Sequence, residues 1–224
     1  MYTNGNLEAH VAALLLLGSI GCIVQLCAAS VLLFFARRNW SRYPLFGIVG
    51  VLVGYGILLV GFSLFSHDRT LARGEEKHFC ELDCHVAYSI QDIQHAKSIG
   101  NTSAQGEFVI ATVRSRFDEQ TIAPRRPHDA PLIPGPVAIA AVSPDGRRFQ
   151  PSAAGQVAWQ ELHGHSHSRM DCLRPAESYT TTVVFDLPLG LGSPRLLLTA
   201  LHKPSVVLIG DEDSPWHRKT YLGL

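Results

Sequence analysis

The chain has 224 residues, with 19 Lys plus Arg against 19 Asp plus Glu and 46% hydrophobic residues. It therefore has room for one domain with accessory segments or for two small domains. The balanced charge, without a basic patch or a Lys/Arg-rich helix, excludes nucleic acid as an expected partner.

The first elements we expect are two transmembrane helices, at about residues 11–36 and 44–66. Both runs lack charged residues, and each exceeds the roughly 20 apolar residues that a helix needs to cross the hydrocarbon core. A cleaved signal peptide would have basic residues before its apolar run. Here Arg37 and Arg38 follow the run instead. We therefore expect a retained helical hairpin over residues 1–67.

The charges at the hairpin turn predict its orientation. The turn contains Arg37, Arg38 and Arg42, whereas no Lys or Arg precedes the first run. Positive residues in short loops stay on the cytoplasmic side. Both termini should then be periplasmic, in a bacterial inner membrane, with residues 68–224 forming a periplasmic domain.

Small residues in the second run predict helix packing. Gly50 and Gly54 form a GxxxG pair, and small residues at this spacing let helices approach closely in lipid. The spans have no ionisable residue at mid-membrane depth, as an ion or proton pathway would require, so a transporter is not expected. The residues that we expect to pack are Gln25 in the first span and Gly47, Gly50, Gly54 and Gly61 in the second.

The external domain is predicted to be all-β. Alternating segments such as CHVAYSIQDIQ and GEFVIATVRSRFD are typical of half-buried strands, and no later segment has a sustained helical period. SPDG at 143–146 predicts a hairpin turn between two strands. Short strands separated by turns favour an antiparallel immunoglobulin-like β-sandwich. Further strands are expected at PVAIAAV, GRRFQ, SYTTTVVFDL, SPRLLLTAL and PSVVLIG.

Two clusters of Cys and His could carry chemistry. FCELDCH places Cys80 and Cys84 four positions apart with His85 next. Haem attachment normally needs two intervening residues between the cysteines, so haem is not expected. A disulfide is possible if residues 81–83 form a tight turn, because the two Cα atoms must lie within about 7 Å. An oxidising compartment favours that bond. A pairing of either cysteine with Cys172 stays open.

The alternative is a copper site. Two transmembrane helices followed by an external β-domain resemble the layout of cytochrome oxidase subunit II, whose copper loop begins with Cys-x3-Cys. The later His and Met of that loop correspond here to Tyr88 and Gln91, which cannot replace those ligands. Imidazole and sulfur ligands from elsewhere could complete a site. The residues of this alternative are Cys80, Cys84, His85, His163, His165, His167, Met170 and Cys172.

Three segments carry a further resemblance: FCELDCHVAYSI, PAESYTTTVVFDLP and VLIGDEDSPWHRKTYL. From Cys80 onward, the chain resembles a family of bacterial membrane-anchored proteins with an immunoglobulin-like β-sandwich. The resemblance implies a fold and an external location, and it carries over no catalytic residues. In architecture, the chain also resembles two-helix accessory subunits of photosynthetic reaction centres.

We therefore expect a non-catalytic accessory subunit, without a cofactor, that stabilises a multi-subunit bioenergetic membrane complex. The specific expectation is a bacterial photosynthetic reaction-centre–light-harvesting complex. The alternative is a copper-binding electron-transfer protein or metallochaperone. Expected partners are the lipid bilayer and other membrane subunits. Because aromatic residues dominate interface hot spots, the candidate anchor is Trp216, with Pro215 and His217 beside it.

Overall fold

The computed structural model describes most of the chain, namely residues 2–3, 9–35, 42–79, 86–119, 127, 129–168, 170–201, 205–207 and 209–224. Along the chain, its elements are β1 (Tyr2–Thr3), α1 (Ala9–Phe35), α2 (Arg42–Leu64), β2 (Arg69–Leu71), β3 (Lys77–His78), β4 (Val86–Ile99), β5 (Thr102–Phe117), β6 (Val137–Val142), β7 (Arg148–Phe149), α3 (Ala153–His163), β8 (Ser178–Leu187), β9 (Arg195–Ala200), the 3-10 turn η2 (Ser205–Val207) and β10 (Thr220–Gly223).

These elements form two compact units. One comprises residues 1–4, 68–203 and 219–224, and the other residues 5–67 and 204–218. The second unit therefore contains α1, α2 and the connection between β9 and β10, a segment that we had expected to belong to the β-domain. We call these the β unit and the helical unit.

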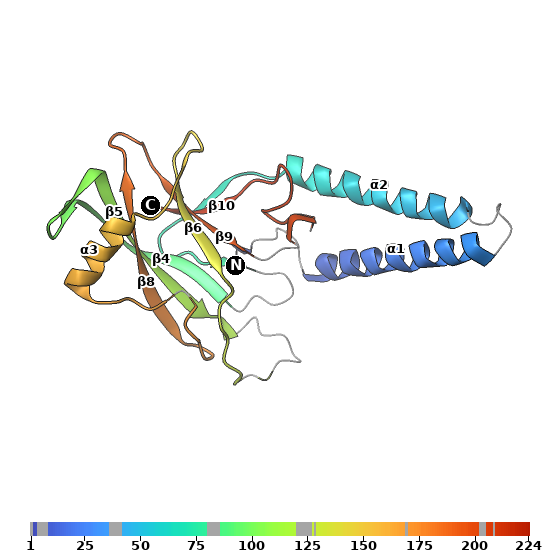
Figure 1. The fold of residues 1–224 in the computed structure, drawn as a ribbon, viewed down its shortest axis with the longest axis horizontal. Coiled ribbons are helices and arrows are strands. Elements are labelled where there is room, and N and C mark those ends of the chain that lie inside the picture. The colour runs from blue at the N-terminus through green and yellow to red at the C-terminus, as the bar shows by residue number, and fades with distance from the viewer. Residues whose placement is uncertain are drawn as a thin grey trace. The chain divides into compact units, whose positions relative to one another are not determined.

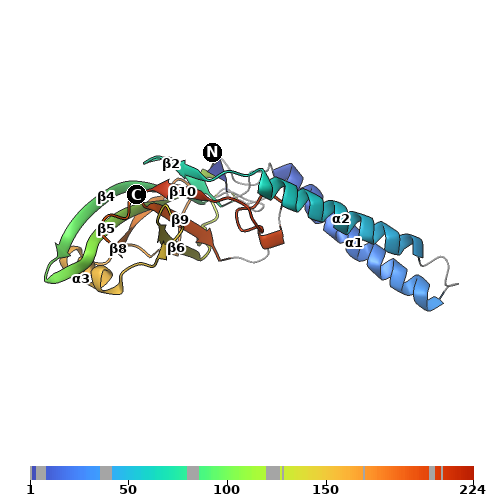
Figure 2. The same ribbon diagram turned by 90° about the horizontal axis from the view of Figure 1, so that it is seen from above.

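The β unit is built from two five-stranded sheets, with strand orders β1-β3-β4-β5-β8 and β2-β10-β9-β6-β7 (Figures 1 and 2). Adjacent strands are mostly antiparallel, but β1 pairs with β3 and β2 pairs with β10 in parallel. The prediction that the region after the two helices is mostly β is thus confirmed.

The core of the β unit lies between the two sheets. It combines Val109 and Val113 of β5 with Phe185 of β8 and with Leu196 and Leu198 of β9. All five side chains are at most 4% exposed. Burying such side chains contributes about 1.5–3 kcal/mol each. Alternation along each strand, which puts every second side chain on the core face, explains why the pattern predicted these strands.

One helix was missed by the sequence analysis. α3 lies against β8 and β5 (Figure 1), and Phe108, Ile110 and Val184 form a second apolar cluster with it. β5 is therefore buried on both faces along this stretch. The prediction that the domain has no helix was wrong, because α3 buries only Gly155 and Ala158 fully, and small residues give a weak helical period.

The predicted β6–β7 hairpin is confirmed. Ala141 pairs with Phe149 and Val142 with Arg148. In the SPDG turn between them, Gly146 adopts a φ of +86°, a conformation that glycine reaches without a steric cost. The predicted strand PSVVLIG, in contrast, forms η2 in its described part, so that prediction was wrong.

Among the described residues, one helical stretch is long and apolar enough to cross a membrane, namely Leu45–Leu64 of α2. The corresponding apolar stretch of α1 is shorter, Ile20–Leu32, although α1 itself extends over 27 residues. By this criterion, the expectation of two spans is met for the second helix and not for the first.

Candidate functional site

The predicted cysteine pair cannot be placed, since Cys80, Cys84 and His85 lie outside the described residues. The strands on either side of them are described. β3 and β4 are antiparallel, and His78 pairs with Ala87. Paired Cα atoms in such a ladder lie about 4.5–5.5 Å apart. The two ends of the intervening segment are therefore close together, which leaves both the disulfide and the metal hypotheses as predictions.

The histidine cluster is not gathered around a common point in the described chain. His163 is in the last turn of α3, where its ring stacks on Trp159 at 3.8 Å. The His167 ring pairs instead with Asp171 at 3.0 Å. Met170 is half exposed, and Cys172 is an exposed free cysteine. These contacts are those of a solvated loop.

A charged cluster that the sequence analysis missed lies at the end of β3 and β5. Arg116 of β5 donates two hydrogen bonds to Glu76, from Nε to Oε1 and from Nη2 to Oε2, both at 2.7 Å. The same Nη2 lies 3.4 Å from Asp118 Oδ2. Asp118 Oδ2 is also 3.0 Å from Nε2 of His78, whose side chain is 3% exposed. A two-pronged Arg–carboxylate pair is among the strongest polar contacts in proteins.

This arrangement controls the ionisation of Glu76. The hydrogen bonds from Arg116 lower the pKa of Glu76 below its ordinary value, although partial burial acts in the opposite direction. The hydrogen bonds with Glu76 in turn raise the pKa of the Arg116 guanidinium. At neutral pH the pair is therefore fully charged, and the guanidinium compensates carboxylates that burial would otherwise penalise.

The cluster has some features of a metal centre. One ligand atom each from Glu76, His78 and Asp118 lies within 4.8 Å of the others, the sole such group among the described residues. His78 Nδ1 is buried and has no hydrogen-bond partner among the described residues. However, the Arg116 guanidinium occupies both oxygens of Glu76. A divalent cation would have to displace it, so the geometry fits an ion-pair network better than a metal site.

Next to this cluster, a buried lysine connects the two sheets. Lys77 is 0% exposed, and its Nζ donates to the carbonyl oxygens of Leu198 in β9 and Thr220 in β10, both at 2.9 Å. The ammonium also lies 5.0 Å from the centre of the Phe79 ring, within cation–π range. Lys77 thus satisfies two carbonyls where the β9–β10 ladder ends.

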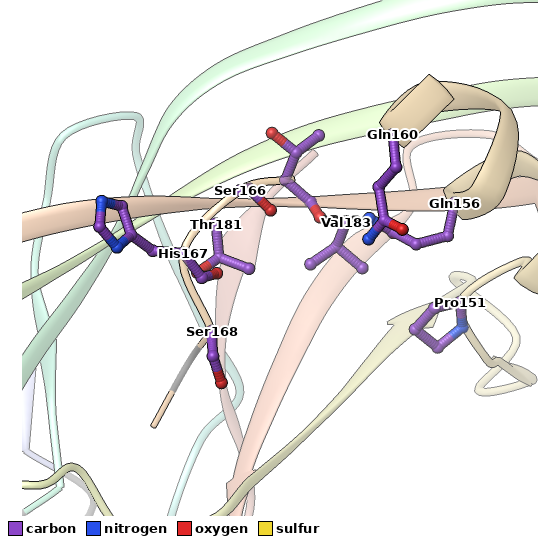
Figure 3. A pocket seen from close by; sticks show the side chains of 9 residues that line it. Pro151, Gln156, Gln160, Ser166, His167, Ser168, Thr181 and Val183 are labelled. Carbon is purple, nitrogen blue, oxygen red and sulfur yellow. Dashed lines mark hydrogen bonds between the residues drawn. The ribbon is translucent and has the colours of Figure 1, made fainter. Parts of the chain in front are cut away.

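The β unit also has an open pocket of about 380 Å³ between α3, the 166–168 loop and β8. Figure 3 shows the side chains of Gln156 and Gln160 extending beside Val183, whereas the His167 ring points away from them. Gln156 is already engaged, because its amide donates to Thr182 O at 3.0 Å and accepts from Val184 N at 3.2 Å. The described lining residues supply hydroxyl, amide, imidazole and apolar groups, and none of them carries a carboxylate, an ammonium or a thiol.

In the helical unit, the predicted glycines have different surroundings. A Cβ added to Gly47 would lie 3.2 Å from Oε1 of Gln25 in α1, whereas one added to Gly50, Gly54 or Gly61 would meet nothing within 4 Å. At 3.6 residues per turn, these four glycines lie near the same side of α2. Contact with α1 therefore explains the need for a small residue at position 47, but not at positions 50, 54 or 61.

The candidate anchor lies in the β9–β10 connection. Trp216 is 71% exposed and Pro215 is exposed, but His217 is buried at 8%. His217 Nδ1 lies 2.7 Å from the carbonyl oxygen of Arg218. Of the three proposed interface residues, only the first two are therefore available to a partner.

No protein-family model and no curated protein matches the chain. Solved structures with similarity include the secreted protein MPT63 from Mycobacterium tuberculosis, at 12% identity and a TM-score of 0.40 over 71% of this chain and 98% of that one. The yjhA protein from Bacillus subtilis has 10% identity and a TM-score of 0.40 over 68% and 98% of the two chains.

A conserved hypothetical protein from Bacillus anthracis has 10% identity and a TM-score of 0.38 over 51% of this chain and 81% of that one. Identities and TM-scores at this level carry neither a fold family nor a function over to the chain. The chain itself has a mostly β unit and a pair of helices. Within the described residues, one apolar stretch of these helices is long enough to span a membrane.

Proposed function

We propose that this chain is a membrane-anchored, non-catalytic accessory subunit. In this proposal α1 and α2 cross the bacterial inner membrane as a hairpin, Arg37, Arg38 and Arg42 remain on the cytoplasmic side, and the β unit is periplasmic. The immunoglobulin-like family and the periplasmic location are parts of the proposal. Its role is to stabilise a multi-subunit bioenergetic complex through contacts in the membrane and outside it.

The observation that carries the proposal is the surface of α2. Only 6% of its apolar stretch is buried within the chain, and Phe46, Leu52 and Ile57 are 59–72% exposed. Such a surface needs lipid or other helices around it, because exposing large apolar patches to water is unfavourable. Gly50, Gly54 and Gly61 have nothing within 4 Å of an added Cβ, and small residues at such positions let another helix approach closely.

The arrangement of the first strand supports an even number of membrane crossings. β1 pairs with β3, so residues 2–3 belong to the same compact unit as residues 68–203. A chain that leaves this unit after residue 4 and returns at residue 68 must cross the bilayer twice or not at all. With α2 as one span, α1 supplies the other.

The test is recovery of partners by a tagged chain extracted in mild detergent. We expect Gly54→Leu to reduce co-purified subunits several-fold, because the larger side chain blocks close helix approach. Gly56→Leu is the matched control, since Gly56 lies about 200° around the helix from Gly54 and also has no neighbour within 4 Å. Equal recovery from both variants, or recovery of the wild-type chain alone, would contradict the proposal.

The same preparation addresses the identity of the complex. A reaction-centre–light-harvesting assembly stays a prediction, and it requires pigment absorbance in the near infrared to follow the tagged chain. Other subunits identified by mass spectrometry without pigment would retain the accessory role and exclude that assembly.

One observation favours the copper-binding alternative. His78 precedes Cys80 by two positions, and its buried Nδ1 has no hydrogen-bond partner in the part of the chain that the structure describes. Imidazole and thiolate together suit copper or zinc. Metal analysis of the chain purified anaerobically separates the two functions. Stoichiometric copper would replace the accessory role with electron transfer or metal delivery, whereas a metal-free chain with bound subunits would exclude the alternative.

A further inference from the structure

The connection between β9 and β10 is part of the helical unit. Residues 204–218 group with α1 and α2 rather than with the sheets. Hydrogen bonds among the described residues join this segment to α2 and to Ser66 just beyond it. The Tyr55 hydroxyl donates to the carbonyl of Val207, and the Arg218 backbone N–H donates to Ser66 Oγ at 2.8 Å. The segment therefore follows α2 from Tyr55 to the end of the helix.

Tyr55 lies well inside the apolar stretch Leu45–Leu64. At a rise of 1.5 Å per residue, its Cα is about 14 Å along the helix from that of Leu64. Backbone polar groups at such a depth must be satisfied within the protein, because hydrocarbon offers no hydrogen bonds. The one hydroxyl-bearing aromatic residue in this stretch is thus bonded to a carbonyl of the connection.

The polarity of the connection is inverted relative to a segment in water. Most of its exposed side chains are apolar, with Val206 at 43%, Val207 at 54% and Trp216 at 71%, and Arg218 at its end is the charged exception. Its buried side chains are mostly polar or charged: Asp211 is 2% exposed, Glu212 1%, Ser214 4% and His217 8%. Acids are almost never buried to this extent unless they are paired, and here they lie in the same segment as exposed valines.

The same arrangement is the expected one in lipid. Acidic groups in a membrane face the protein interior, and the apolar side chains face outward. Trp216 occupies the end of the segment that is bonded to Ser66, just beyond the apolar stretch of α2, and Trp is enriched at this interfacial level. Phe65, beside Ser66, is 84% exposed and adds apolar surface at the same level.

We propose that residues 205–207 and 209–217 belong to a membrane-inserted segment that lies along the outer half of α2, with Val206, Val207 and Trp216 in contact with lipid. The inference rests on the proposed membrane anchoring and adds a third lipid contact, one that belongs to neither helix. Its occupant is the bilayer, and a protein partner covering Trp216 is an outcome that the experiment distinguishes.

The experiment uses tryptophan fluorescence of the full chain in phosphatidylcholine vesicles whose acyl chains carry bromine, which quenches nearby indoles. The chain has three tryptophans, at positions 40, 159 and 216. Three variants, each with two of them changed to Phe, report on one residue at a time. We expect quenching of Trp216 by at least two-fold relative to unbrominated vesicles. Trp159 in the β unit should not be quenched.

The outcomes separate this inference from the proposed function. Quenching of Trp40, at the expected hairpin turn, without quenching of Trp216 would overturn the inserted segment and retain the hairpin. Absence of quenching at both positions would overturn the anchoring and the inference together. Quenching of Trp216 that is lost only when co-purified subunits are added back would assign the surface to a protein partner, against the inference.

A second pair of variants tests the valines. Val207→Asp, in the Trp216-only chain, should lower Trp216 quenching by at least half, because a carboxylate cannot remain at that depth. Val157→Asp is the matched control, since Val157 on α3 is 55% exposed and Val207 is 54% exposed. The control should leave quenching unchanged. Unchanged quenching in Val207→Asp would contradict contact of this residue with lipid.

Discussion

At the scale of single residues, the ion pair between Arg116 and Glu76 is the feature that most affects the β unit. We expect Arg116→Met to lower the free energy of unfolding by about 1–3 kcal/mol, less than the 3–5 kcal/mol of a fully buried pair, because both side chains are about a quarter exposed. Arg114→Met, on the same strand and also partly buried, is the control. Thermal unfolding followed by circular dichroism measures both, and equal losses would contradict a specific role for Arg116.

The same pair makes stability depend on pH. Because the folded-state pKa of Glu76 is lowered from about 4.5, its stabilising contribution is complete above the unfolded pKa. The contribution is lost as the pH falls through the lower folded value. We expect the melting temperature to drop more steeply below about pH 4.5 in the wild type than in Arg116→Met. Parallel pH profiles for the two chains would show that Glu76 ionisation is not coupled to folding through Arg116.

At the scale of secondary-structure elements, Gly155 sets the distance between α3 and the sheet. A Cβ at this position would lie 2.7 Å from Cγ1 of Val184 and 3.0 Å from Cε1 of Phe108. Overpacking of about 1–3 kcal/mol should exceed the gain in helix propensity, near 1 kcal/mol. We therefore expect Gly155→Ala to lower stability, as measured by denaturant unfolding.

A double-mutant cycle checks the cause. In a Val184→Ala background, the side chain closest to the new methyl group is shorter, so Gly155→Ala should be less costly there. An equal loss in both backgrounds would mean that helix–sheet spacing is not the reason.

The elements that the sequence predicted are those whose pattern is local. SPDG carries its own turn geometry, β8 is rich in β-branched residues, and β6 and β9 are short apolar runs bounded by turn signals. α3 has little apolar periodicity because its buried side is Gly155 and Ala158. β3 was missed because Lys77 and His78 do not read as core residues. Their burial depends on the carbonyls of Leu198 and Thr220 and on the carboxylate of Asp118, all distant in sequence.

The candidate sites, too, were predicted where the signal is local in sequence and missed where it depends on distant residues. Cys80, Cys84 and the histidines 163–167 attracted attention because they are adjacent in sequence, yet the described cluster joins Glu76 and His78 to Arg116 and Asp118, about forty positions away. Only pairing of β3 with β4 and of β4 with β5 brings these residues together. A short apolar run such as PSVVLIG is equally compatible with a buried strand and with other structures.

At the scale of the whole molecule, the proposed topology predicts the result of proteolysis. In spheroplasts, protease added outside should cut the C-terminal β unit, whereas in inverted vesicles the β unit should be protected. An epitope at residue 224 reports on both preparations by immunoblot. Protection in spheroplasts together with cleavage in inverted vesicles would reverse the orientation of the hairpin.

The connectivity of the two units has a mechanical consequence. The chain passes between them at four places, after residues 4, 67, 203 and 218, and three of these passages are next to β2, β9 and β10. Those strands are neighbours in one sheet, in the order β2-β10-β9. A load applied through the helices therefore enters this layer of the β unit at three adjacent strands, and it enters the opposite layer at β1 alone. Lys77 belongs to the opposite layer and donates hydrogen bonds to carbonyls of β9 and β10. It therefore links the two layers at the strands where the load enters.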